Sequence, residues 1–184
     1  MHMRKLVLAL AICHILSVNL LVADDKETIS LREFIELLVD STSNEVLIER
    51  KKIRTKDPLL LKRSGFATYM ANKYPHLIDS EGYVNFNKDI TIKNCRFYQN
   101  LYLHKVNFNA SFTIKGSRLE TVSFKDSRSQ KITFLNNKVF HEIEMSKVNM
   151  DELEANNNTL HHILVLDKCT VNKSLKINNN TIEI

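Results

Sequence analysis

The sequence predicts an all-β solenoid, a parallel β-helix with about 21 residues per coil, over residues 84–184. Three observations lead to this fold class. Pairs of apolar residues separated by one polar residue recur every five or six positions. The first residue of each pair alternates between a large apolar side chain and a small or polar one. The chain also contains only three Gly and two Pro, which disfavours a sandwich with many tight turns, whereas Asn, which tolerates left-handed corners, is abundant.

The apolar pairs identify the repeating unit. Between the two members of a pair, the intervening residue is apolar only at Tyr102 and Val165. Steps of five or six positions fit neither a helical stripe nor ordinary antiparallel strands. They are typical of a solenoid in which each short face points two side chains inward and the next coil covers them. The paired positions are apolar throughout, with the exceptions of Ser117, Ser127, Ser129, Asn137, Asn158 and Asn180.

The alternation of large and small residues predicts four faces per coil. Similar residues should stack on one another, so a coil holds an even number of faces. Two faces would leave too little interior for the Phe and Leu residues. Four faces, at five or six positions each, give the coil length stated above. Positions four steps apart in the repeat are then neighbours in consecutive coils.

Some repeat units resemble a known family. In "CRFYQ" (95–99), "SRLET" (117–121), "VSFKD" (122–126) and "CTVNK" (169–173), a small residue precedes a large one by two places. These units resemble the pentapeptide-repeat family, and the resemblance implies a right-handed quadrilateral β-helix for residues 84–184. The family's Ala-Asp/Asn-Leu triplet is nearly absent, and some of the steps are hexads. A looser right-handed β-helix and a left-handed hexapeptide type therefore remain alternatives.

Residues 1–23 have the outline of a secretory signal peptide. Arg4 and Lys5 precede an apolar run at 6–23, and Ala23 provides the small residue expected before cleavage. An uncleaved membrane anchor is the alternative. We expect a secreted, periplasmic or cell-surface protein without stable membrane insertion after cleavage. Loss of Arg4 and Lys5 leaves basic residues only slightly in excess of acidic ones, a balance that does not suggest nucleic-acid binding.

Residues 24–83 are predicted to form an N-terminal cap and an insert. Ser30 and Glu33 form a capping box at the start of the amphipathic helix in "TISLREFIELLVDS", which we expect to cap the open end of the solenoid. "EVLIERKKI" (45–53) shows the two-face pattern and is a candidate first rung. Short helices are expected in the irregular segment 54–83. The apolar stripe of the capping helix consists of Leu31, Phe34, Ile35 and Leu38.

Arg96, Arg118 and Lys138 are the candidate binding residues. They are outward residues of pairs four steps apart, so they should stack in one column, which Thr159 and Thr181 continue. Three like charges in a row repel one another unless an anion or a nearby acid offsets them. A binding strip for a sulfated, carboxylated or phosphorylated polymer is one interpretation. A solvated edge with neighbouring acids is the other.

Two further sets of residues are placed by the repeat. Asn137, Asn158 and Asn180 should point inward in one column and hydrogen-bond to one another as a ladder. Cys95 and Cys169 begin pairs three and a half coils apart. Because a disulfide requires Cα atoms within about 7 Å, we expect no disulfide and two buried free thiols.

The sequence offers no catalytic constellation, metal site or cofactor motif. Glu144 and Glu154 are half a coil apart and should point outward from opposite faces, so they cannot act on one bond. His161 and His162 lack a ligand spacing. The acidic cluster as a whole comprises Glu142, Glu144, Asp151, Glu152 and Glu154.

These features predict an exported, non-enzymatic structural or binding module of the cell envelope or surface, which recognises an acidic polymer, such as an acidic glycan, or a protein. The alternatives are a polysaccharide-acting enzyme on a β-helix scaffold and, from the family resemblance, a DNA-mimicking topoisomerase inhibitor. The latter would need a strongly acidic face. The last coil, ending in "TIEI", lacks a closing segment and predicts an end-to-end homodimer or a truncated reading frame.

Overall fold

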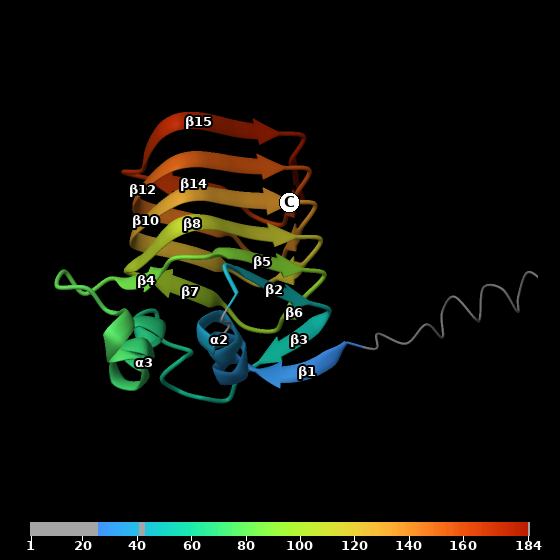
Figure 1. The fold of residues 1–184 in the computed structure, drawn as a ribbon. Helices are drawn as coiled ribbons and strands as arrows, with labels where there is room; N and C mark the ends of the chain where they lie inside the picture. The colour runs from blue at the N-terminus through green and yellow to red at the C-terminus, as the bar shows by residue number, and fades with distance from the viewer. Residues whose placement is uncertain (1–25, 41–42, 184) are drawn as a thin grey trace, which may run out of the picture.

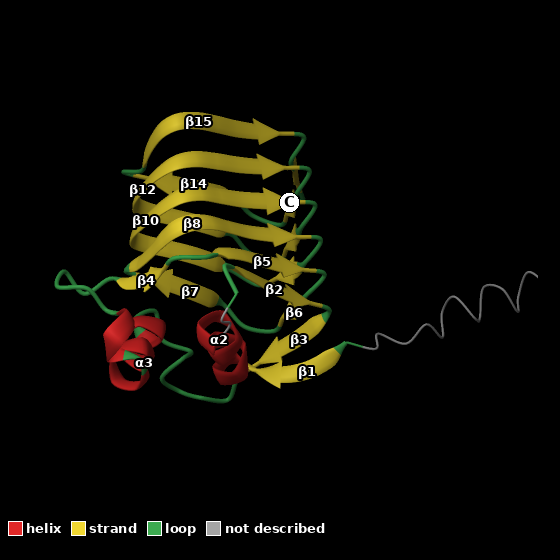
Figure 2. Cartoon of the chain, in the orientation of Figure 1, coloured by secondary structure: helices red, strands yellow, loops and turns green. Residues whose placement is uncertain are grey.

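The structure is a computed structural model that describes residues 26–40 and 43–183. The predicted signal peptide lies outside the described residues. Strands account for 56% of the structure, two helices accompany them, and long parallel sheets dominate the fold (Figure 2). The prediction of a mostly β, parallel architecture is confirmed, and the sheets are compatible with a β-solenoid.

In the described part of the chain, the strands form two parallel sheets. The seven-stranded sheet has the order β1-β3-β6-β9-β11-β13-β16, and the nine-stranded sheet is built around the path β14-β12-β10-β8-β5-β2. The first sheet comprises β1 (Glu27–Ser30), β3 (Lys51–Arg54), β6 (Arg96–Phe97), β9 (Arg118–Leu119), β11 (Lys138–Val139), β13 (Thr159–Leu160) and β16 (Thr181–Ile182). The second comprises β2 (Glu45–Glu49), β4 (Val84–Phe86), β5 (Asp89–Lys93), β7 (Leu101–His104), β8 (Val106–Lys115), β10 (Val122–Leu135), β12 (Ile143–Asn156), β14 (Leu164–Asp167) and β15 (Thr170–Asn178).

The strand register follows the repeat. Val122 pairs with Leu101 on one side and with Ile143 on the other, so its two partners lie equally far before and after it in the sequence. Each partner begins the apolar pair four steps away. The candidate first rung also joins the sheets, because Val46 pairs with Ile90.

Residues in the left-handed conformation mark the bends of the chain. One set has φ between 54° and 61° just before the seven-stranded sheet, at Asn94, Gly116, Asn136, Asn157 and Asn179. Asn tolerates this conformation better than other residues with a side chain. At Gly116 a Cβ atom would also lie 2.5 Å from Oδ1 of Asn94, so a larger residue there would displace the Asn94 side chain. The second set comprises Lys105, Asp126, Lys147 and Lys168.

Four strands are longer than the predicted faces of five or six residues. β10 and β12 each run for 14 residues, β8 for 10 and β15 for 9. Pairing of β10 with β12 continues on both sides of the bend. The inward positions still match the prediction. Phe108, Phe112, Phe124 and Phe134 are buried and pack in edge-on or tilted contacts along the stack. Five of the six polar exceptions are also buried, namely Ser117, Ser127, Ser129, Asn137 and Asn158.

Helix α2 (Leu31–Asp40) lies at the N-terminal end of the strand stack, away from β15 (Figure 1). Its capping box is present, since the backbone N–H of Glu33 donates to Ser30 Oγ at 3.1 Å and the Ser30 N–H donates to the Glu33 carboxylate at 2.6 Å. The ring centroid of Phe34 lies 5.3 Å from that of Phe97 in β6. The helix therefore covers inward side chains at this end, and its stripe of Leu31, Phe34, Ile35 and Leu38 is buried.

The segment between β3 and β4 contains α3 (Gly65–Lys73) and the short 3-10 helix η1 (Pro75–Leu77). Short helices were expected in 54–83, and "DPLLLKR" (57–63), where Asp57 and Pro58 suit the start of a helix, is not helical. The Asp57 carboxylate accepts the backbone N–H of Leu59 at 2.9 Å as a cap would, but turns follow instead of a helix. Strand β1 was not predicted, because it is short and its partner β3 lies beyond both the capping helix and β2 in the sequence.

The last strands expose side chains that the repeat pattern places inward. Leu175 and Ile182 are each 54% exposed, and Ile177 is 41% exposed. In the described part of the chain, no further strand covers them. The end-to-end homodimer through this coil stays a prediction.

Candidate functional site

The structure brings Arg96, Arg118 and Lys138 together on the outside of the seven-stranded sheet. Arg118 in β9 is the register partner of Arg96 in β6 and of Lys138 in β11. Thr159 and Thr181 continue the same column in β13 and β16. Neighbouring strands lie about 4.8 Å apart, so the three cationic side chains start from closely spaced positions.

Sequence reasoning missed a fourth member of the column. Lys52 in β3 pairs with Arg96, and Thr28 in β1 pairs with Lys52. The two-face pattern in 45–53 was the available signal, but an irregular insert separates it from the main repeat. We call Lys52, Arg96, Arg118 and Lys138 the basic column.

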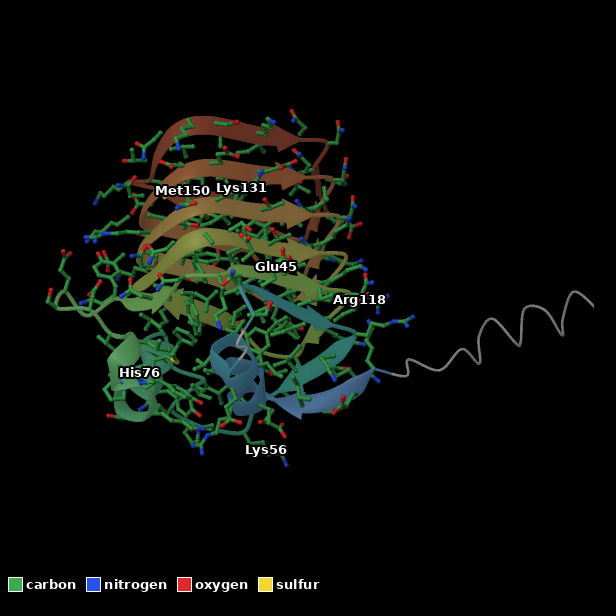
Figure 3. All side chains as sticks on the ribbon, in the orientation of Figure 1. Glu45, Lys56, His76, Arg118, Lys131 and Met150 are labelled. Carbon is green, nitrogen blue, oxygen red and sulfur yellow. The ribbon has the colours of Figure 1, made fainter. Side chains whose placement is uncertain are left out.

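The positive charge of the basic column is offset at its last member and not at Arg118. The Lys138 ammonium lies 3.7 Å from the Glu183 carboxylate, which offsets its charge. Among the residues that the structure describes, the Arg118 side chain has no ion-pair or hydrogen-bond partner, and it is exposed. Figure 3 shows Arg118 at the side of the strand stack, directed away from the ribbon.

Tyr98 lies beside the basic column, and its hydroxyl is affected by the nearby cations. The Arg96 guanidinium lies 4.5 Å from the ring centroid, and that of Arg54 lies 3.9 Å from it. The hydrogen bond from Arg54, with the charges of Arg96 and Lys52, lowers the pKa of the Tyr98 hydroxyl. These cations favour the anionic form of a neighbouring group, as they would favour a bound anion.

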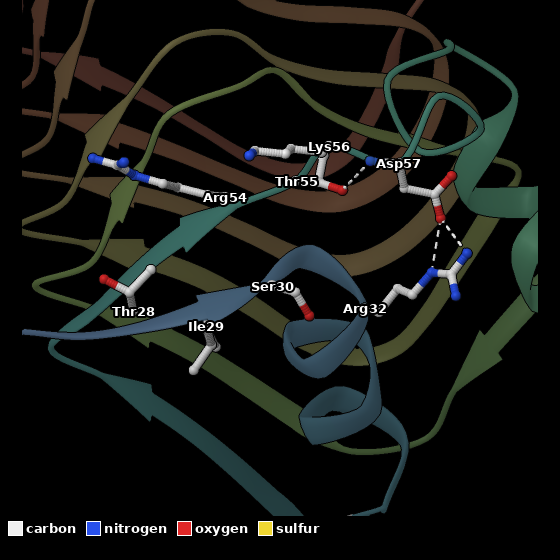
Figure 4. A pocket seen from close by; sticks show the side chains of 8 residues that line it. All are labelled: Thr28, Ile29, Ser30, Arg32, Arg54, Thr55, Lys56 and Asp57. Carbon is white, nitrogen blue, oxygen red and sulfur yellow. Dashed lines mark hydrogen bonds and ion pairs between the residues drawn. The ribbon is translucent and has the colours of Figure 1, made fainter.

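A cavity of about 390 Å³ lies near the N-terminal end of the basic column (Figure 4). Arg54 and Lys56 line it, together with hydroxyl groups that include those of Thr28 and Ser30. The carboxylate of Asp57 in the cavity wall is engaged by Arg32, whose Nε donates to Oδ2 at 2.7 Å. This carboxylate therefore does not neutralise Arg54 or Lys56.

The three inward asparagines form the predicted ladder. Asn137 Nδ2 donates to Asn158 Oδ1 at 3.1 Å, and Asn158 Nδ2 donates to Asn180 Oδ1 at 3.0 Å. The same oxygens accept the backbone N–H groups of Asn137 and Asn158. Asn137 Oδ1 in turn accepts the N–H of Ser117 at 2.9 Å. The ladder is a structural element of the interior and presents no group to a ligand.

Cys95 and Cys169 are both free. Cys95 is buried, its thiol lies 3.5 Å from the carbonyl oxygen of Ile48, and burial raises its pKa. Cys169 is only half-buried, which corrects the expectation of two buried thiols. The reason is its place in the last coil, where no described strand covers it.

Four of the acidic side chains that might have served catalysis are divided among three partners. Glu144 accepts a hydrogen bond from Ser123 Oγ at 2.9 Å, whereas Glu152 and Glu154 share the ammonium of Lys131. Asp151 accepts a hydrogen bond from Lys173 Nζ at 2.7 Å. Glu144 therefore has no partner in common with the other three. The expected separation of Glu144 from Glu154 agrees with these contacts.

Sequence reasoning missed a buried polar chain. His104 Nε2 lies 3.1 Å from Ser123 Oγ, which donates to Glu144, and Glu144 Oε1 lies 3.6 Å from the Arg63 guanidinium. Ser123 is 1% exposed, so its hydroxyl is not placed to attack a substrate. The chain instead connects the insert to β7, β10 and β12. A single His followed 19 residues later by a Ser is not a recognisable sequence motif.

Burial lowers the pKa of His104, partly opposed by the charge of Glu144. The unfolded chain, with a His pKa of about 6.5, therefore takes up a proton at higher pH than the folded protein does. The free energy of unfolding should therefore decrease as the pH falls from about 6.5 toward the lower pKa that His104 has in the folded protein. Urea denaturation at about pH 8 and pH 5 measures this decrease in the free energy of unfolding, which should be smaller in His104→Gln than in the wild type. The control is His162→Gln, because His162 is exposed, and its decrease should equal that of the wild type. An equal decrease in His104→Gln and the wild type would contradict the prediction.

Comparisons with known proteins give no match: no family model, no curated protein and no solved structure matches the chain. Among the described residues, no group of three His, Cys, Asp or Glu side chains could hold a metal ion. No helix in that part of the chain is long and apolar enough to cross a membrane.

Proposed function

We propose that residues 45–53 and 84–183 form a right-handed quadrilateral β-helix of the pentapeptide-repeat type, with about 21 residues per coil. The register of β7, β10, β12 and β14 supports this coil length, because partners keep one constant separation in the sequence across all four strands. The two sets of left-handed residues, half a coil apart, support bends that repeat in every coil.

The chain acts, in this proposal, as an exported, non-enzymatic binding module of the cell envelope or surface. Residues 1–23 would direct export. The ligand would be a linear acidic polymer, such as a sulfated or carboxylated polysaccharide, bound along the basic column. The observation that carries the proposal is the consecutive register of Lys52, Arg96, Arg118 and Lys138. A rigid row of cations matches repeated anionic groups, and the self-repulsion of the row is relieved when they bind.

Binding of the mature protein to an array of acidic glycans and lipopolysaccharide tests this proposal. Changing Arg96, Arg118 and Lys138 to Ser should weaken binding by about tenfold or more, because each exposed cation contributes roughly 0.5–1 kcal/mol. The affinity of the wild type should fall with rising salt concentration, and that of the variant should fall less.

A matched variant controls for net charge. Lys115, Lys125 and Lys176 are exposed lysines outside the basic column, and changing all three to Ser removes the same charge. This variant should keep most of the affinity. No binding by the wild type, or equal losses in the two triple variants, would refute the role of the column.

A further inference from the structure

Two adjoining hollows lie away from the seven-stranded sheet, and β8, β10, β12 and β15 contribute residues to the first of them. A hollow of about 190 Å³ is lined by Asn107, Asn109, Arg128, Gln130 and Asn149, among others. It shares Asn109 with a neighbouring hollow of about 340 Å³ that reaches the insert. We call the two together the amide groove. In Figure 3, Met150 of β12, whose strand contributes to the groove, lies on the opposite side of the stack from Arg118.

The amides of the groove are aligned by the strand register. Asn107 pairs with Asn85 below it and with Arg128 above it, and Arg128 pairs with Asn149. Hydrogen bonds run along this direction. Asn107 Nδ2 donates to Asn85 Oδ1 at 2.8 Å, and Asn172 Nδ2 donates to Asn149 Oδ1 at 3.1 Å.

Asn107, Asn109 and Asn149 each use one polar group on a neighbouring side chain and keep another for the groove. Within residues 26–40 and 43–183, Asn107 Oδ1, Asn109 Oδ1 and Asn149 Nδ2 have no protein hydrogen-bond partner, and neither does the exposed amide of Gln130. The bonds between neighbours hold the three asparagine side chains in place before a ligand arrives. Such preorganisation reduces the entropy cost of binding.

The charged groups of the groove are paired within the protein. Arg128 binds the Glu81 carboxylate at 2.6 Å and lies over the ring of Tyr83. Lys173 binds Asp151 at 2.7 Å. The Asp79 carboxylate, which also lines the groove, accepts the backbone N–H groups of Glu81 and Tyr83. Most of the polar groups that the groove presents are therefore neutral donors and acceptors. A polyanion gains little here, in contrast to the basic column.

We propose that the amide groove binds a neutral linear oligosaccharide. Sugar hydroxyl groups both donate and accept hydrogen bonds, so they can use the free amide oxygens and nitrogens together. Asn107 and Asn149 lie two strands apart, with Arg128 between them, so their free groups repeat at about twice the 4.8 Å strand spacing. Such a repeat suits a chain with a regularly repeating polar unit.

Isothermal titration calorimetry with cellohexaose, maltohexaose, xylohexaose and the chitin hexamer tests this inference on the wild-type protein. At least one of the four should bind, and its affinity should be the same at low and high salt. Changing Gln130 and Asn149 to Ala should weaken binding by about tenfold or more. Asn178→Ala removes an exposed amide outside the groove and should leave binding unchanged.

The outcome is independent of the proposed function. The variant with Arg96, Arg118 and Lys138 changed to Ser should still bind the oligosaccharide. Its affinity should again be the same at low and high salt. Thermal unfolding of the Gln130, Asn149 double variant checks that the fold is kept. Absence of binding for all four oligosaccharides, or unchanged binding by the folded double variant, would overturn the inference.

Discussion

Deleting residues 122–142 should leave a folded protein with one coil fewer. Ile143 then follows Thr121 and takes the place of Val122, its register partner. The residues of the next coil likewise take the places of their register partners in the deleted one. Asn158 then stacks on Ser117 in the buried column, and the left-handed bends stay aligned. Stability should fall modestly, as in other stacked repeats where each unit contacts only its neighbours.

Deleting only residues 122–131 should abolish cooperative folding. Ile132 would replace Val122, which keeps inward residues inward but moves every later face by half a coil. Val148 instead of Asn137 would then lie over Ser117, so the Ser117 N–H and the Ile114 carbonyl oxygen would lose the amide that now binds them. Each buried backbone group without a partner costs roughly 1–3 kcal/mol.

Circular dichroism and urea denaturation compare the two deletions. The longer deletion should keep the strand signal and a cooperative transition, and the shorter one should lose both. If the shorter deletion folded as well as the longer one, the proposed coil length would be wrong.

Asn158→Leu should lower the free energy of unfolding by about 3–5 kcal/mol, because leucine has the same branched shape but leaves buried backbone groups without partners, at roughly 1–3 kcal/mol each. Asn158 is 2% exposed, its Oδ1 accepts the N–H of Asn137, and its Nδ2 donates to the carbonyl oxygen of Phe134. The loss of the amide contact with Asn137 adds to the effect.

Two other asparagines provide graded controls for this measurement. Asn180→Leu should cost less, because Asn180 is only partly buried and water can replace some of its bonds. Asn157→Gly should be close to neutral, since Asn157 is exposed and has a φ of 55°, which glycine adopts readily. Chemical denaturation of the three variants measures the series. A loss below about 1 kcal/mol for Asn158→Leu would show that the ladder is dispensable.

The triplet at 156–158 shows why so much of the fold could be predicted. Asn156 Oδ1 accepts the N–H of Asn178, Asn157 turns the chain in the left-handed conformation, and Asn158 points inward. Three identical residues thus have three roles set by their place in the repeat. The triplet at 178–180 repeats the pattern one register period later, with Asn179 left-handed and Asn180 accepting from Asn158.

The candidate site was only partly predictable. Arg96, Arg118 and Lys138 follow from the repeat, because outward residues four steps apart are neighbours whatever their type. Lys52 does not, since the insert interrupts the count before the first main coil. The amide groove also escaped, because outward Asn and Gln residues are ordinary on a surface. Only the structure shows that Asn107, Arg128 and Asn149 share one hollow.

By itself, the sequence determined the strands, their inward faces, the order in which they stack and the capping helix. These follow from local periodicity and capping chemistry, which short stretches of chain carry on their own. The tertiary structure decided the pairing of β1 with β3, the burial of His104 beside Ser123, and the hollows of the surface. Those features depend on contacts between segments distant in sequence, such as the packing of the irregular insert against the regular stack. The repeat pattern carries no information about these contacts.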